Sequence, residues 1–170
     1  MSMYSLLAAL SEANVDYVLV GGLAVSLHGY QRVTMDVDVV LALNDANLSR
    51  FIDCAQAANL KPVLPVPLES LRNAALIDQW HREKGMLAVA LRGADVMATV
   101  IDVLVRPVVP FETLKRNAVA TRVGPLSIPV ASLDDLVTLK TGTGRSKDAL
   151  DIEELLKIKH RLAEGRDGRR

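Results

Sequence analysis

The sequence is poor in cysteine, in aromatic residues and in net charge, and each shortage excludes a class of protein. The lone cysteine, Cys54, cannot form an internal disulfide, which fits a reducing cytoplasm better than a secreted scaffold. Aromatic residues make up 4% of the chain, too few for a row of base-stacking platforms. The 20 acidic and 20 basic residues cancel, so no overall field draws the chain to nucleic acid or to anionic lipid.

Long hydrophobic runs and targeting segments are also missing. No apolar stretch reaches the length of a membrane span, and the first residues show neither a basic region nor a small-residue cleavage site. Half of the 170 residues are nevertheless hydrophobic, which is enough to bury a full core. We therefore expect a cytoplasmic protein with no membrane contact, folded as a single domain over residues 1–170.

Residues 17–43 carry the chemistry of the chain. They read as a buried strand, a pair of glycines (Gly21 and Gly22), a short apolar helix and a second strand that holds Asp36 and Asp38. Acidic side chains are depleted from strands, because a carboxylate among apolar neighbours must find a cation or lose its charge. Alternate side chains of a strand share a face, so the two carboxylates point the same way. They make half of a divalent-metal site.

A third acid, Asp102, lies in the equally aliphatic run TVIDVLV. Alone, Asp36 and Asp38 would more often belong to an edge strand that faces water, and a glycine pair would more often be an ordinary turn. Three acids in predicted strands, together with the glycines, reverse that preference. The pattern indicates one shared site.

Periodicity and capping residues predict an α+β fold, in which helices flank a mixed sheet and the C-terminus is helical. Helices are expected over residues 3–13, 23–28, 68–82, 111–116 and 147–162, with two more after the caps Asn44 and Ser132. Strands are expected over residues 16–20 and 35–43, an extended piece within 61–67, and hairpins that pair 86–91 with 96–105 and 118–122 with 126–130. The final residues GRDGRR are expected to fray.

These motifs resemble the nucleotidyltransferase superfamily of DNA polymerase β, in particular its small prokaryotic members. The resemblance lies in the glycine pair, the short helix that ends HGYQR, the strand TMDVD and, further along, IDVL. The segment SLDDLVTLKTGTGRSKDALDIEELL is similar to the closing helices of a branch that includes the nucleotidyltransferase toxins of abortive-infection and toxin–antitoxin systems. The similarity covers nearly the whole chain and implies the nucleotidyltransferase fold.

The resemblance also implies a reaction, the transfer of a nucleoside monophosphate (NMP) from a nucleoside triphosphate (NTP) to a hydroxyl group. Asp36, Asp38 and Asp102 would hold two Mg²⁺ ions, or Mn²⁺, with Asp102 completing the site on the acceptor side. The backbone at Gly21 and Gly22 would approach the triphosphate where the short helix begins.

Further nucleotide contacts are expected from Arg32 and Thr34, just upstream of the acids. In many relatives a hydroxyl residue directly follows the glycine pair, whereas this chain has Leu23, so Ser26 or another donor would have to take its place. Lys140 matches a lysine that the resembling branch uses close to the nucleotide. The GRxKDxxD segment of that branch is matched by Arg145, Lys147, Asp148 and Asp151.

The sequence leaves simpler roles open for the C-terminal residues. Lys140 could lie on a solvated helix face, and Asp148 and Asp151 could serve only the dipole of the last helix.

Three functions remain. The first is a metal-dependent nucleotidyltransferase acting on RNA, protein or a small molecule, which by family analogy could be a toxin with a cognate antitoxin or a small helical partner. The second is a non-catalytic relative that binds a nucleotide or a partner, for which Leu23 is the main hint. The third is a sugar-nucleotide transferase that uses Asp36 and Asp38 as a DxD motif, which does not account for the glycine pair and Asp102 together.

Overall fold

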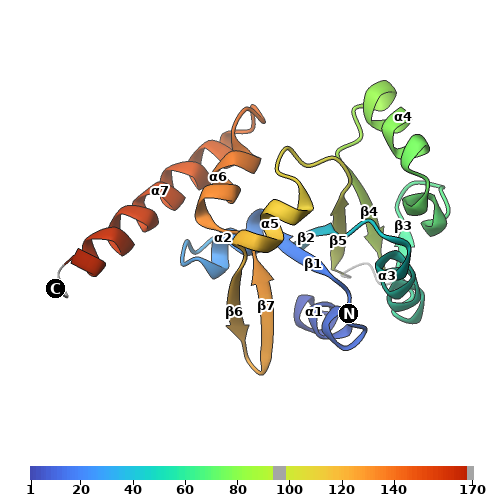
Figure 1. The fold of residues 1–170 in the computed structure, drawn as a ribbon, viewed down its shortest axis with the longest axis horizontal. Helices are drawn as coiled ribbons and strands as arrows, with labels where there is room; N and C mark the ends of the chain where they lie inside the picture. The colour runs from blue at the N-terminus through green and yellow to red at the C-terminus, as the bar shows by residue number, and fades with distance from the viewer. Residues whose placement is uncertain (94–98, 168–170) are drawn as a thin grey trace.

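In the computed structural model, which describes residues 1–93 and 99–167, helices surround a mixed sheet (Figure 1). Within those residues seven strands follow the order β3-β4-β5-β2-β1-β7-β6. The strands are β1 (Tyr17–Val20), β2 (Asp36–Leu41), β3 (Lys61–Pro62), β4 (Ala88–Arg92), β5 (Val100–Leu104), β6 (Val119–Val123) and β7 (Leu126–Val130). The helices are α1 (Met3–Glu12), α2 (Gly21–Leu27), α3 (Asp45–Ala57), the 3-10 helix η1 (Leu68–Arg72), α4 (Ala74–Lys84), α5 (Phe111–Asn117), α6 (Leu133–Lys140) and α7 (Ser146–Asp167). The predicted α+β class with a mixed sheet is confirmed.

Strand β2 lies at the centre of the sheet. It pairs antiparallel with β1 on one side and parallel with β5 on the other. Val37 and Val39 of β2, with Ile101 and Val103 of β5, have no exposed surface. Because side chains alternate along a strand, burying these residues against one face turns the acids of both strands to the other face. A water-facing edge strand is thereby excluded for the two acids of β2.

Side-chain caps set several helix starts, as the sequence predicts. The Asn44 side chain accepts the N–H of Asn47 at the start of α3, and the Ser132 hydroxyl accepts the N–H of Asp135 at the start of α6. The single helix expected over residues 68–82 is wrong. Asn73 ends η1 and caps α4 through the N–H of Leu76, because a side-chain acceptor at this position begins a new helix.

Element ends differ from the expectation in two further places. Helix α2 begins at Gly21, directly after β1, so no separate turn precedes it. Helix α7 continues to Asp167, beyond the end expected at residue 162, while residues 168–170 lie outside the described chain. The antiparallel pairing of β4 with β5 is as predicted, although residues 94–98 of that hairpin are also outside the described part.

The C-terminal helix extends from the body of the molecule. Helix α7 packs against α6 through its first half and then runs outward toward the C-terminus (Figure 1). Residues 159–165 are exposed along the whole outer stretch. Among the described residues, no helix combines the length and apolar character that crossing a membrane demands.

Candidate active site

The glycine pair forms a tight joint between β1 and α2. Val20, the last residue of β1, lies opposite Asp38 of β2, so the chain turns directly beside this carboxylate. Gly21 has a φ of +68°, and a Cβ atom built on it would lie 1.9 Å from Oδ2 of Asp38. Only glycine accepts both the backbone angle and the contact. The backbone N–H of Gly22 donates a hydrogen bond to the same carboxylate.

The three acids gather on one face of two neighbouring strands. Asp38 and Asp102 are direct partners in the parallel pairing of β2 and β5. Asp36 lies two residues before Asp38 on the same face, paired with Val100, and its side chain is exposed. The sequence expectation that the acids lie together therefore agrees with the sheet register.

Burial and repulsion between carboxylates make Asp38 and Asp102 reluctant to ionise. Burial raises the pKa of Asp38 to about 6, and repulsion from Asp102 and Asp36 adds to the rise, while the Gly22 N–H and the charge of Lys140 oppose it. The pKa of Asp102 is also raised, first by burial and then by the charge of Asp36. A cation placed between the acids would remove this penalty.

The acids suit a metal ion that takes some of its ligands from the protein and the rest from a substrate and water. Within the described residues, no three His, Cys, Asp or Glu side chains are arranged to enclose one metal ion. Mg²⁺ in phosphate-transfer sites is held by one or two carboxylates, with phosphate and water oxygens completing the shell. Asp38 and Asp102 on neighbouring strands, with Asp36 beside them, supply that hard-oxygen donor set. The residues fit Mg²⁺ or Mn²⁺.

Lys140 is a buried cation and not part of a solvated helix face. Its ammonium lies 2.9 Å from Oδ1 of Asp148 and 2.7 Å from Oδ2 of Asp151, and 7% of its side chain is exposed. Both acids are on the first turns of α7, so the lysine at the end of α6 joins the two helices. Because its charge also lowers the pKa of Asp38, the pair of helices places positive charge near the acids.

Arg32 extends this network to the glycine joint. Its Nη1 donates to Oδ2 of Asp151, the oxygen that also contacts Lys140. The guanidinium of Arg32 thus pairs with Asp151 and not with Asp102, whose neighbours are the other strand carboxylates. The two residues of this pair are 119 positions apart, and no spacing in the sequence indicates it.

Asp148 organises the loop between α6 and α7. It accepts from Nε of Arg145 at 2.5 Å and from the Thr143 hydroxyl at 2.7 Å. Burial acts to raise the pKa of Asp148, but hydrogen bonds from Lys140, Thr143 and Arg145 outweigh it and hold the pKa at about 2. Thr143 was missed in the sequence, where TGTGR indicates only a turn. Lys147, the remaining matched residue, is exposed.

The polar residues around α2 have separate roles. Ser26 donates its hydroxyl to the carbonyl of Gly22 at 3.1 Å, one turn back along the helix. Thr34 and Arg32 lie over Gly22 from the loop before β2, because a Cβ atom on this glycine would be 3.0 Å from Oγ1 of Thr34 and 3.1 Å from Arg32. The structure brings Gly21, Gly22, Arg32 and Thr34 to the acids.

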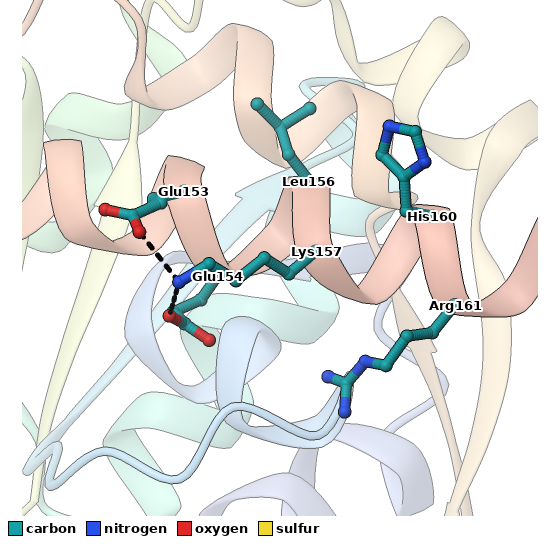
Figure 2. A pocket seen from close by; sticks show the side chains of 6 residues that line it. All are labelled: Glu153, Glu154, Leu156, Lys157, His160 and Arg161. Atoms are coloured by element: carbon teal, nitrogen blue, oxygen red, sulfur yellow. Dashed lines mark hydrogen bonds and ion pairs between the residues drawn. The ribbon is translucent and has the colours of Figure 1, made fainter.

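A hollow lies on α7, apart from the acids. Its lining comes from α7 alone, and none of the three strand carboxylates takes part (Figure 2). Lys157 bonds to Glu153 and Glu154 across this surface. Exposed pairs of this kind are screened by water and contribute little to stability.

Comparison with known proteins gives a family and a fold. A family model described as "Nucleotidyl transferase AbiEii toxin, Type IV TA system" matches residues 5–166. No curated protein matches the chain. Among solved structures, the lincosamide antibiotic adenylyltransferase LnuA bound to lincomycin has a TM-score of 0.59 and 17% identity, over 92% of this chain and 96% of that chain. ANT(2″)-Ia in complex with adenylyl-2″-tobramycin has a TM-score of 0.56 and 11% identity, over 99% of this chain and 97% of that chain. At identities this low, the likeness shows a shared fold and nothing further.

Proposed function

The chain belongs to the AbiEii family of nucleotidyltransferase toxins, and from that premise we propose that it transfers NMP from an NTP to a hydroxyl group with divalent metal ions. The observation that carries the proposal is the meeting of Asp38, Asp102 and the glycine joint at one place in the sheet. The raised pKa of Asp38 supports the proposal, because neighbouring carboxylates without a cation destabilise the fold and such perturbed groups cluster at functional sites. The third function, a sugar-nucleotide transferase with a DxD motif, does not account for Asp102 or for the glycine joint.

In this proposal the acids hold the metal and the cations hold the triphosphate. Asp36, Asp38 and Asp102 supply oxygen ligands to Mg²⁺ or Mn²⁺, which when bound stabilises charge on the attacking hydroxyl and on the leaving pyrophosphate. The network of Arg32, Lys140 and Arg145 with Asp148 and Asp151 carries three positive and two negative charges, so it keeps one excess positive charge near the acids. That excess favours a triphosphate.

The acceptor is a hydroxyl on RNA, protein or a small molecule. The family description supports a toxin, whose partner would be a cognate antitoxin. One structural neighbour is named as a lincosamide antibiotic adenylyltransferase and another is in complex with adenylyl-2″-tobramycin, which supports a small-molecule acceptor as an alternative. We place the reaction in the cytoplasm, where NTPs are present.

A non-catalytic nucleotide-binding role is the competing function. Leu23 favours it, because the residue after the glycine pair cannot donate a hydrogen bond to phosphate. Against it stands the set of three acids, which nucleotide binding alone does not require.

The test is transfer of label from each α-labelled NTP, with Mg²⁺ or Mn²⁺, to a bacterial extract that offers all three acceptor classes. Products are sorted by sensitivity to ribonuclease and protease. Asp38→Asn and Asp102→Asn should lower transfer by orders of magnitude, since a metal is lost or misplaced. Asp53→Asn, an exposed acid on α3, is the matched control and should transfer normally. Metal-dependent NTP binding by the wild type without any labelled product would favour the non-catalytic role.

A further inference from the structure

The first turn of α2 brings no hydroxyl group to the acids. The helix reads GGLAVSL, so its first hydroxyl belongs to Ser26. That hydroxyl lies 3.1 Å from the carbonyl oxygen of Gly22 and 3.4 Å from that of Arg32. A serine has one proton to donate, and here two backbone oxygens compete for it. Ser26 is therefore occupied within the fold and is a poor donor to phosphate.

Thr34 and Arg32 fill the place beside Gly22 instead. A Cβ atom on this glycine would lie 3.0 Å from the Thr34 hydroxyl oxygen and 3.1 Å from Nη2 of Arg32. Two polar groups thus cover the backbone of Gly22 in the space that a side chain there would take. The N–H of the same glycine binds Asp38, so hydroxyl, guanidinium and carboxylate meet at one residue.

Both groups have donor capacity left for a ligand. Arg32 uses Nη1 on Asp151, and this contact leaves Nη2 directed at Gly22. The Thr34 hydroxyl is 3.5 Å from the carbonyl oxygen of Asp36, at the outer limit of a hydrogen bond. Its proton is easily redirected to a stronger acceptor such as a phosphate oxygen.

We infer that Thr34 and Arg32 form the phosphate clamp of this chain, supplied by the loop before β2 in place of the absent hydroxyl on α2. The hydroxyl of Thr34 and Nη2 of Arg32 donate to a phosphate of the NTP that lies over Gly22, and Gly22 lacks a side chain because the clamp occupies its space. The inference rests on the proposed function, which supplies the nucleotide.

The experiment measures binding of a non-hydrolysable NTP analogue with Mg²⁺ by calorimetry, in the full-length wild type and three variants. Thr34→Val keeps the shape and removes the donor, so it should bind about tenfold to a hundredfold more weakly, the loss expected of one hydrogen bond to a charged group. Thr34→Ser should bind within about threefold of the wild type. Ser26→Ala, the matched control on α2, should do the same.

The outcomes separate the clamp from the proposed function. A wild type that binds no NTP would overturn both. Normal binding by Thr34→Val beside a wild type that binds NTP would overturn the clamp alone, as would a loss confined to Ser26→Ala. Melting curves of each variant check that the fold is intact.

Moving the hydroxyl gives a second test. Gly22→Ser alone should weaken binding, because its Cβ atom crowds Thr34 and Arg32. The double variant Gly22→Ser with Thr34→Ala removes the crowding by Thr34, so that only the end of the flexible Arg32 side chain has to shift, and it returns a hydroxyl from the helix side. It should bind NTP at least fivefold more tightly than Thr34→Ala, about 1 kcal/mol. No gain over Thr34→Ala would mean that a hydroxyl is not required beside Gly22, and would overturn the clamp.

Discussion

Replacing Asp38 by asparagine should stabilise the metal-free protein while it removes activity. The pKa of Asp38 rises from 3.8 to about 6, a difference of about two units. At about 1.36 kcal/mol per unit, ionising this buried carboxyl costs the folded state about 3 kcal/mol at neutral pH. Asparagine is neutral, and its side-chain oxygen can still accept the N–H of Gly22. We expect Asp38→Asn to raise the free energy of unfolding by about 1 to 3 kcal/mol at pH 7.5.

The sign of this effect depends on pH. A carboxyl whose pKa is raised by folding costs nothing below its unfolded pKa, and the cost grows as pH rises through the window between 3.8 and about 6. The advantage of Asp38→Asn should therefore disappear near pH 4 and be complete above pH 7. Each kcal/mol should shift the melting temperature by about 2 to 4 °C in a chain of this size.

The assay is thermal and urea unfolding in the presence of a chelator, from pH 4 to pH 8. The control is Asp148→Asn, an acid whose pKa is lowered to about 2 by hydrogen bonds from Lys140, Thr143 and Arg145 that outweigh its burial. Its contribution to stability is present above pH 4 and lost as pH falls toward 2, so this substitution should destabilise at pH 7.5 by about 3 kcal/mol. Destabilisation by Asp38→Asn at neutral pH, or a pH-independent gain, would refute the reasoning.

Three further outcomes are expected. Gly21→Ala should lower the free energy of unfolding in urea by several kcal/mol, because its Cβ atom meets Asp38. The control Gly85→Ala, also at positive φ but with no atom within 4 Å, should lower it by about 1 kcal/mol. Equal losses in the two variants would mean that the contact with Asp38 is relieved by movement. Lys140→Met should lower the affinity for NTP and the melting temperature together, since it leaves two buried acids with one cation fewer, and an unchanged affinity would remove Lys140 from the site. Mg²⁺ and NTP together should raise the melting temperature more than either alone, by mass action on the folded state, and a chelator should reverse the shift.

The acids could be predicted from the sequence because their signal is local. Carboxylates at alternate positions of an aliphatic strand share a face whatever the partner strand is, so the sequence alone predicts that Asp36 and Asp38 lie on one face. Placing Asp102 beside Asp38 needed the resemblance as well, because strand order is a property of the whole sheet. The structure adds the register, and with it the direct pairing of these two acids.

The cation network could not be predicted in the same way. Arg32 and Asp151 belong to segments far apart in the chain, and either could have found another partner.

The break at Asn73 was missed because the apolar pattern continues across it, while the cap depends on one side-chain hydrogen bond. The length of α7 was underestimated because its last turns are exposed, so no apolar periodicity marks them.

The contact between Arg32 and Asp151 also sets an order in time. Ribosomes add about 5 to 20 residues per second, so the 119 positions between these residues correspond to about 6 to 24 seconds of synthesis. During that interval Gly21, Gly22 and the acids of β2 have been synthesised, while the part of α7 that fixes Arg32 has not. A chain that stops before α7 would carry the acids of the site without the anchored guanidinium or the paired lysine. Under the proposed function, the nucleotide site is therefore complete only after the first turns of α7 have been made.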